Sequence, residues 1–334
     1  MNPKIFLKLA NRWIFRRKPV YAHFGITHHC NLQCRMCGIE RDIREDEELS
    51  VEQIERVFDN LKRLGVIYVS IGGGEPFLRK DLLLVIRLLI NKGFIVRLLT
   101  NGTLVDEKSI RGLVLAGLRE ISVSLDTLDP DKFTYICGEE KIFEKIMNSL
   151  DIFANVLPRN NRLILINTVV SPLNVKELPG LAEFAGKKGF YISFIPVESR
   201  GLTDFTFEQG DNKAIDDSYD YLIRMKKKNK GPIFNSSMFL EKSREYLKSG
   251  KCDWQCDAGK LYFSLNPKGE LSICHKFNKS IPLLNADIKD LSLIKDARQD
   301  LIKSCPGCLR PCWAEISFLF KNMTSLCEMC RIRF

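Results

Sequence analysis

Short apolar runs alternate with longer amphipathic stretches from residue 21 to residue 197. The apolar runs are rich in β-branched residues and predict strands at Tyr21–Thr27, Val66–Ile71, Phe94–Leu99, Glu120–Leu125, Leu163–Val170 and Phe190–Pro196. The amphipathic stretches predict helices at Val51–Leu64, Asp81–Asn91, Glu107–Ala116, Glu140–Phe153 and Val175–Lys188. Helix N-caps are expected at Ser50 and Asp106, and helix ends at Gly65, Gly93, Gly117 and Gly189.

Six strands separated by helices of crossover length predict an α/β fold with a parallel sheet and right-handed connections. A closed barrel of this kind needs eight such units, so six units predict an open, partial (β/α)6 TIM-like barrel. In this architecture the chemistry lies on the loops that follow the carboxyl ends of the strands.

Four segments are expected along the chain. Residues 1–20 are an N-terminal amphipathic segment, residues 21–203 the partial barrel and residues 204–250 a polar helical linker. Eight of the twelve cysteines follow residue 250, so residues 251–334 are expected to form a small cysteine-rich C-terminal domain.

The composition places the chain among soluble globular proteins, with 45% hydrophobic and 28% charged residues. The longest apolar run, Leu82–Ile90, is short and interrupted by Arg87, which excludes a membrane-embedded bundle. No signal peptide is recognisable, so a cytoplasmic location is expected, where thiols stay reduced and clustered cysteines bind metal. The net charge of +10 permits acidic partners, but we expect no nucleic-acid binding.

The segment Ile5–Phe15 has an apolar face and is followed by three basic residues. Two interpretations stay open: a membrane-surface helix, which would make the protein membrane-associated, or a helix that covers the open end of the barrel.

Three cysteines follow the first strand in the pattern Cys30-x3-Cys34-x2-Cys37. One loop can present these three thiolates to one iron–sulfur cluster, which normally takes four ligands, so one iron stays open for substrate. The alternative is a zinc knuckle, with His28 or His29 as the fourth ligand.

Polar and glycine residues follow the later strands. Gly72-Gly73-Gly74-Glu75-Pro76 comes after the second strand, where glycines allow close approach of a ligand and Glu75 offers an anion. Thr100-Asn101-Gly102 follows the third strand and has the composition of a tight turn. On the fourth strand, alternation places Ser122, Ser124 and Asp126 on one face.

Together these motifs resemble the radical S-adenosylmethionine (SAM) superfamily, and the resemblance covers Tyr21 to Val197 and continues toward the C-terminus. It implies that Cys30, Cys34 and Cys37 bind a [4Fe–4S] cluster whose open iron chelates SAM. The reduced cluster then cleaves SAM to a 5′-deoxyadenosyl radical, which abstracts hydrogen from a substrate.

The resemblance also includes Thr100-Asn101-Gly102, which matches the family's TNG motif, and it implies roles for single residues. Met36 packs by the adenine, and the loop with Gly73, Gly74 and Glu75 binds the SAM amino group. Ser124 contacts the ribose or the carboxylate, with Asp126 nearby, although Asp126 can instead only cap a turn. Asn167 points at the cofactor or makes a structural hydrogen bond.

One departure from the family concerns the loop after the fourth strand, where many relatives carry an arginine for the SAM carboxylate. This chain has Tyr135-Ile136-Cys137-Gly138 there. Either another base such as Lys132 takes over, or the carboxylate binds differently. Cys137 is a buried spectator or, as a catalytic candidate, a thiol hydrogen donor near the substrate.

The C-terminal cysteines resemble the SPASM extension of radical SAM enzymes, which holds auxiliary [4Fe–4S] clusters. Asn266–Gly269 predicts a hairpin turn that positions Cys274. One or two auxiliary clusters are expected, one on Cys252, Cys256, Cys274 and Cys312, the other on Cys305, Cys308, Cys327 and Cys330. The second set can equally be a tetrahedral zinc site.

The resemblance therefore implies an oxidoreductase or maturase that modifies a peptide or protein. Two alternatives stay open: the same radical chemistry on a lipid or another small molecule, and a non-enzymatic iron–sulfur or zinc protein. A reductant such as flavodoxin or ferredoxin is implied as a partner.

Overall fold

The computed structural model describes residues 18–39, 47–158, 160, 162–198, 201–228, 231–274, 280–284, 298, 302–303, 305 and 307–330. Its strands form one sheet in the order β6-β5-β4-β3-β2-β1-β7-β8-β9. The first six are parallel: β1 Tyr21–Thr27, β2 Tyr68–Gly73, β3 Ile95–Thr100, β4 Glu120–Ser124, β5 Leu163–Val170 and β6 Tyr191–Pro196. The expected α/β partial barrel is confirmed.

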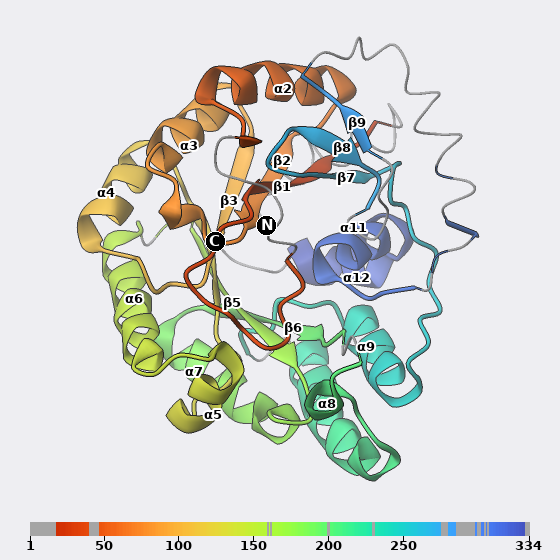
Figure 1. Ribbon diagram of the computed structural model, residues 1–334. Helices are drawn as coiled ribbons and strands as arrows, with labels where there is room; N and C mark the ends of the chain where they lie inside the picture. Colours follow the sequence, from red (N-terminus) through yellow and green to blue (C-terminus); the bar gives the residue numbers. More distant parts are fainter. Residues whose placement is uncertain are drawn as a thin grey trace.

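Helices surround this curved sheet, which Figure 1 views along the barrel. Their bounds are α2 Val51–Leu64, α3 Leu82–Asn91, α4 Glu107–Leu115, α5 Pro130–Cys137, α6 Ile142–Val156, α7 Leu178–Lys188, α8 Asn212–Lys227 and α9 Ser237–Ser249. Ser50 caps α2 in a capping box with Gln53, and Asp106 caps α4, as predicted.

Helix α5 was not among the predicted helices. It begins after Asp129, whose side chain accepts hydrogen bonds from the amides of Asp131 and Lys132, and Pro130 occupies its first turn. An N-cap aspartate followed by proline is a helix-start signal, so this helix was recognisable from its cap but not from its short apolar pattern.

The chain after residue 250 continues the barrel sheet. Strand β7, Tyr262–Leu265, pairs in parallel with β1, and the antiparallel strands β8, Glu270–Ser272, and β9, Ser280–Pro282, follow. The predicted hairpin is therefore present, but in the described residues it adds to the barrel sheet and forms no second sheet.

Helix α11, Pro311–Lys321, lies in the gap between β7 and β6, with α12, Met323–Cys330, beside it (Figure 1). The Trp313 ring stacks on the Tyr262 ring of β7, with centroids 5.6 Å apart. On the other side, the Glu315 carboxylate accepts a hydrogen bond from the Ser236 amide at 2.9 Å, just before α9. Helix α11 thus connects the two edges of the open barrel.

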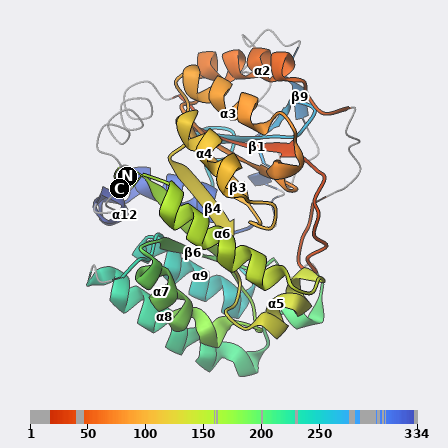
Figure 2. The ribbon, with the colours of Figure 1, turned by 90° about the vertical axis from the view of Figure 1, so that its left-hand side faces the viewer.

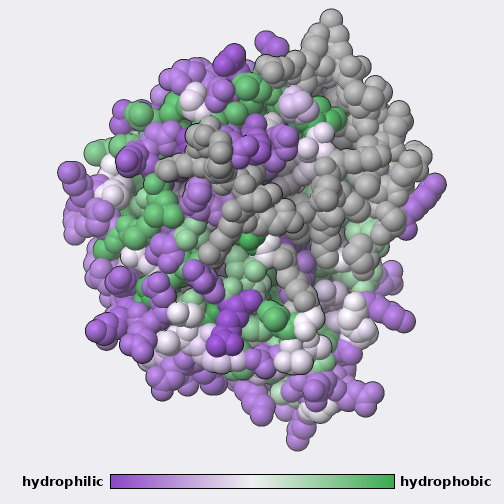
Figure 3. Space-filling view, in the orientation of Figure 1, coloured by the Kyte–Doolittle hydropathy of each residue, from purple (hydrophilic) through white to green (hydrophobic). Residues whose placement is uncertain are grey.

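Figure 2 shows the outer helices from the side, with α2, α3 and α4 at one end of the barrel wall and α7 and α8 at the other. On the face in Figure 3, hydrophilic residues predominate over these outer helices. Among the described residues, no helix is both long and apolar enough to cross a membrane. The amphipathic segment Ile5–Phe15 lies outside the described residues.

Candidate functional site

Three thiols gather on the loop that follows β1. Cys30 and Cys34 are half-buried, Cys37 is exposed, and all three line a barrel cavity of about 1190 Å³. The amide of Cys37 donates a hydrogen bond to the carbonyl of Cys34 at 3.0 Å, which closes the loop. Burial raises the pKa of Cys30, and the charges of Glu75 and the other two cysteines raise it further. A positively charged metal centre would reverse this shift, because thiolates are the ligand form.

The glycine loop after β2 packs directly on the cysteine loop. The amide of Gly74 donates to the Thr27 carbonyl at 2.7 Å, and the Glu75 amide donates to the His29 carbonyl at 2.8 Å. A Cβ atom at Gly74 would lie 1.9 Å from the His29 carbonyl oxygen, so no other residue fits. Glycines at this position bring the backbone of Gly72–Gly74 into the cavity wall.

The Glu75 side chain is not among the residues that line the cavity, and its expected role as a direct partner of an ammonium group stays a prediction. It is fully buried and accepts hydrogen bonds from the Asn101 amide at 2.7 Å, the Thr100 hydroxyl at 2.8 Å and the Phe77 amide at 3.1 Å. Burial raises the pKa of this carboxyl group, and these donors oppose the shift. Glu75 therefore positions the loop after β3 against the loop after β2.

Asn101 reaches the cysteine loop, a contact that the tight-turn interpretation missed. Its Nδ2 lies 3.8 Å from Cys30 Sγ and donates to the Asn31 side-chain oxygen at 3.0 Å. Its Oδ1 accepts hydrogen bonds from the amide and the hydroxyl of Thr103 at 2.9 and 2.7 Å. These bonds orient the amide so that its NH₂ group faces the Cys30 sulfur.

A polar row on β4 and β5 also lines the cavity. Ser124 and Asn167 are directly paired in the sheet register, and both line the cavity together with Met36. The position of these three residues agrees with a cofactor shelf. No described contact identifies the cofactor itself.

Asp126 is turned away from this row. Its carboxylate is buried and accepts a hydrogen bond from the Val169 amide at 2.7 Å, and its carbonyl accepts one from Asn174. Burial raises the pKa of Asp126 to about 7, and the bond from Val169 opposes this. Asp126 neither lines the cavity nor caps the following turn; it ties the end of β4 to β5.

Cys137 and Lys132 lie outside the cavity as well. The Cys137 thiol is 4% exposed and hydrogen-bonded to the Cys34 thiol, and this bond, together with burial, raises its pKa. Cys137 is thus a neighbour of the proposed cluster ligand Cys34. It is not among the residues that line the cavity, where a thiol hydrogen donor to the substrate would lie. Lys132 forms an ion pair with Glu177. It is no substitute for the missing arginine.

Farther inside the barrel, the cavity wall is largely apolar but includes three small polar side chains, Ser70 on β2, Ser122 on β4 and Ser193 on β6. Ser122 is buried, and its hydroxyl has no hydrogen-bond partner in the described part of the chain. In closed eight-stranded barrels, bulky branched side chains fill the interior in layers.

The opposite wall of the same cavity comes from α11. The Cys312 thiol is exposed to this cavity and hydrogen-bonded to the Tyr21 hydroxyl, and desolvation by the surrounding barrel raises its pKa to about 11. One turn later, Glu315 leaves its Oε2 without a hydrogen-bond partner among described residues, and burial raises the pKa of the carboxyl to about 7. His23 faces them from β1 with a pKa lowered to about 4, by burial and then by the Arg310 charge.

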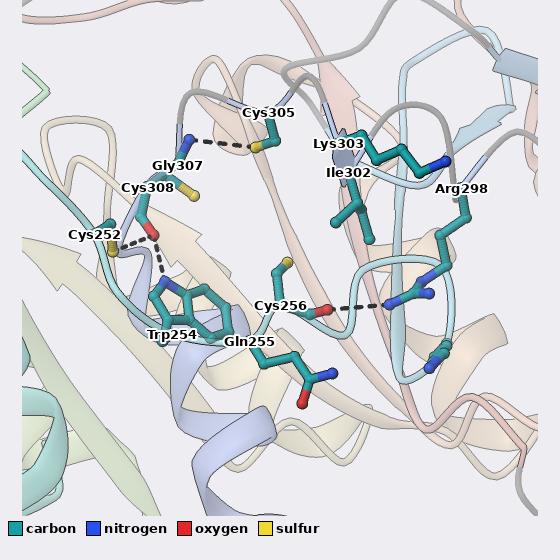
Figure 4. Close-up of a pocket in the computed structure, with 11 residues that line it drawn as sticks. Cys252, Trp254, Gln255, Cys256, Arg298, Ile302, Lys303, Cys305, Gly307 and Cys308 are labelled. Atoms are coloured by element: carbon teal, nitrogen blue, oxygen red, sulfur yellow. Dashed lines mark hydrogen bonds between the residues drawn. The ribbon is translucent and has the colours of Figure 1, made fainter.

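A second group of thiols lines a separate cavity of about 410 Å³ (Figure 4). Cys252, Cys256, Cys305 and Cys308 surround it. Cys252 Sγ donates to the Cys308 carbonyl at 3.1 Å, and the Gly307 amide donates to Cys305 Sγ at 3.4 Å. This grouping combines two cysteines from each of the expected auxiliary sets.

The other C-terminal cysteines lie elsewhere. Cys312 lines the barrel cavity, Cys274 is buried beyond β8, and Cys327 is exposed on α12. The Cys330 side chain lies outside the described residues. The two expected auxiliary sets stay predictions, and the structure groups Cys252, Cys256, Cys305 and Cys308 around the smaller cavity. Within the described ranges, no three His, Cys, Asp or Glu side chains converge on a single metal-ion position.

The sequence profile of the radical SAM superfamily matches residues 24–185. Among curated proteins, GTP 3′,8-cyclase of Mannheimia succiniciproducens is 27% identical over 87% of this chain and 86% of its own length. The probable GTP 3′,8-cyclase of Methanothermobacter marburgensis and the GTP 3′,8-cyclase of Tolumonas auensis are 30% and 32% identical. The chain spans only about three fifths of the length of these two, 59% and 61%.

Solved structures show the same fold. Streptococcus suis SuiB bound to S-adenosylmethionine superposes with a TM-score of 0.65 and 17% identity, over 88% of this chain and 71% of SuiB. The anSMEcpe structure with bound AdoMet gives a TM-score of 0.62 and 17% identity, over 82% of this chain and 80% of that one. Both superpositions include more of the chain than its six-stranded barrel alone.

Proposed function

Because this chain belongs to the radical SAM superfamily, as the sequence motifs predicted, we propose that Cys30, Cys34 and Cys37 hold a [4Fe–4S] cluster for SAM. When bound and reduced, the cluster supplies the electron that cleaves SAM to methionine and a 5′-deoxyadenosyl radical, which abstracts hydrogen from the substrate.

The protein's part in this reaction is to hold SAM and exclude water. Backbone groups of Gly72–Gly74, with Ser124, Asn167 and Met36, form the proposed shelf for SAM. Glu75 and Asn101 support this shelf from behind, because both connect its loops through hydrogen bonds. The segment Tyr135–Gly138 after β4 carries no arginine for the SAM carboxylate, so we propose polar side chains such as Ser124 and Asn167 as its partners.

The single observation that carries this proposal is the hollow barrel interior. Serines occupy inward positions on β2, β4 and β6, where closed eight-stranded barrels carry bulky branched side chains. The cavity, largely apolar elsewhere, extends from the cysteine loop to α11. Ser122 and Glu315 each present a buried oxygen without a partner in the described residues, and such atoms normally find one. We therefore propose that a polar substrate group fills this space between SAM and α11.

Our first candidate substrate is a peptide or protein side chain. SuiB and anSMEcpe, which share the fold, have been solved with a precursor peptide and with other peptides. The second candidate is a nucleotide-like small molecule, favoured by similarity to GTP 3′,8-cyclases along most of the chain. If added GTP stimulates SAM cleavage and is itself converted to a cyclised product, the second candidate is established.

We further infer that Cys252, Cys256, Cys305 and Cys308 hold one auxiliary [4Fe–4S] cluster, since four thiols surround one cavity. A flavodoxin or ferredoxin is the proposed electron donor. Contact with a membrane surface through residues 1–20 remains a proposal from the sequence alone.

The test is SAM cleavage by anaerobically reconstituted protein. With dithionite and SAM, the wild type should release 5′-deoxyadenosine, and Cys30→Ala, Cys34→Ala and Cys37→Ala should each abolish it. Cys327→Ala is the matched control, because this exposed thiol on α12 lines neither cavity and its loss should leave cleavage intact. Normal turnover in any of the three ligand variants would refute the assignment.

A further inference from the structure

The side chain of Asn101 occupies a position that no motif assigned to it. It belongs to the loop after β3, yet its Nδ2 lies 3.8 Å from Cys30 Sγ, on the loop after β1. This is a hydrogen-bonding distance for an N–H group and sulfur, which is larger and softer than oxygen.

Four further hydrogen bonds hold Asn101 in this orientation, three to its side chain and one to its backbone amide. Thr103 donates to Asn101 Oδ1 from both its amide and its hydroxyl, and Asn101 Nδ2 also donates to Asn31 Oδ1. The backbone amide of Asn101 is held by the buried Glu75 carboxylate at 2.7 Å. The amide and the hydroxyl of Thr103 both donate to Asn101 Oδ1, so the NH₂ group of Asn101 is directed to the other side, toward Cys30 Sγ.

We propose that Asn101 is a positioning residue that tunes the reduction potential of the SAM-binding cluster through an N–H···S hydrogen bond to Cys30. The proposal rests on the proposed function, in which Cys30 is a cluster ligand. Hydrogen bonds to cluster sulfurs are one of the means by which proteins set this potential. Donation to the thiolate stabilises the more negative, reduced cluster, so the bond raises the potential.

The Cys30 sulfur has a second donor from the backbone, because the Leu32 amide donates to Cys30 Sγ at 3.5 Å. Among the described side chains, Asn101 is the one whose donor atom is recorded on Cys30 Sγ. Replacing Asn101 therefore removes the side-chain donor and leaves the backbone donor in place.

The experiment compares the midpoint potential of the SAM-binding cluster in wild type, Asn101→Ala and Asn101→Asp, by redox titration followed with EPR. Each protein also carries Cys252→Ala and Cys308→Ala, so that the proposed auxiliary site contributes no signal. We expect the cluster in both Asn101 variants to have a more negative midpoint potential than wild type at full iron occupancy. The shift should be larger in Asn101→Asp, because that variant replaces a donor with an anion.

Asn31→Ala is the comparison variant, because it removes one of the contacts that hold the Asn101 side chain, and the bond from Asn31 to Thr103, but keeps the Asn101 donor group itself. It should shift the potential less than Asn101→Ala. An equal shift in Asn31→Ala, or an unchanged potential in Asn101→Ala, would overturn the proposal. If Asn101→Ala loses its iron, the isosteric Asn101→Asp decides, and an unchanged potential there counts against the hydrogen bond.

Failure of the proposed function and failure of the proposed role of Asn101 give different results. A parent protein without any cluster on Cys30, Cys34 and Cys37 would refute the proposed function and this inference with it. A normal cluster whose potential does not depend on Asn101 would refute the inference alone. Loss of an exchangeable-proton coupling to the reduced cluster in Asn101→Ala, compared in H₂O and D₂O, gives a second readout that loop bracing would not change.

Discussion

The Glu75 carboxylate accepts a hydrogen bond from the Asn101 backbone amide at 2.7 Å, which joins the loops after β2 and β3. The same carboxylate holds Thr100 and Phe77. Glu75, the acidic residue of the glycine-rich motif, thus binds the protein's own loops through hydrogen bonds, and these loops form part of the cavity wall.

Glu75→Gln should therefore destabilise the protein. The substitution keeps one acceptor oxygen but places an NH₂ group against a backbone donor, and losing a bond to a buried charged group costs about 1.5–3 kcal/mol. Anaerobic denaturant unfolding and iron analysis should show lower stability and incomplete cluster loading. Ser124→Ala should instead weaken SAM binding with stability and iron unchanged. If Glu75→Gln lowered SAM affinity without lowering stability or iron content, the result would support a direct ammonium-binding role for Glu75 instead.

Gly74→Ala should disrupt the cysteine loop. The added Cβ would lie 1.9 Å from the His29 carbonyl, a backbone atom that cannot move without displacing the loop that carries Cys30. We expect a loss of about 1–3 kcal/mol or more, with reduced iron content. Gly180→Ala is the control: this exposed position in α7 has nothing within 4 Å, and alanine should stabilise the helix by about 0.5–1 kcal/mol. Equal behaviour of the two variants would contradict the proposed packing.

Iron content should follow the grouping of cysteines in the structure. Cys252→Ala combined with Cys308→Ala should remove about four irons and leave the SAM-dependent spectrum intact. Cys305→Ala should lose the same cluster, whereas Cys312→Ala should retain it, because Cys312 lines the barrel cavity. The reverse pattern, with iron lost in Cys312→Ala and kept in Cys305→Ala, would support the grouping expected from the sequence.

Glu315→Gln should change the pH dependence of stability. The pKa of Glu315 is raised by burial from 4.5 to about 7, so the folded state favours the protonated form. Its stabilising contribution is complete below pH 4.5 and is lost as the pH rises through about 7. The Gln variant keeps the bond from Ser236 without an ionisable group, and it should exceed wild type by about 3 kcal/mol at pH 8.

This difference should disappear toward pH 5, and urea unfolding at several pH values measures it. The wild type also contains His23, whose lowered pKa makes stability rise with pH between about 4 and 6.5. Only the difference between variant and wild type therefore isolates Glu315. A difference that stays constant from pH 5 to pH 8 would show that the carboxyl group does not titrate as its burial implies.

The barrel was predictable because each of its elements carries a local signal. Strands β1 and β5 and helix α2 have the predicted bounds, and the caps at Ser50 and Asp106 act as expected. Sequence could not reveal which strand pairs with β1, since register between distant strands depends on tertiary packing. The same limit applies to the thiols, because spacing along the chain placed Cys274 and Cys312 in one set, whereas the fold separates them.

Side-chain direction was the other limit. Alternation correctly placed Ser122 and Ser124 toward the interior, but it also placed Asp126 there, just beyond the end of β4 at Ser124. Period-two alternation holds only within the strand. For Glu75 and Asn101, residue type suggested an anion and a turn, and only the packed loops show what each side chain contacts.

The parallel pairing of Tyr21 with Tyr262 affects how this chain emerges from the ribosome. Strand β1 is synthesised about 240 residues before β7, and one of its two edges stays unpaired until β7 has been made. An exposed parallel edge invites pairing with other chains, and closing so long a loop is slow. The newly made barrel therefore passes through a long interval in which β1 has one open edge, and protection of that edge by a chaperone would matter most before residue 262 appears.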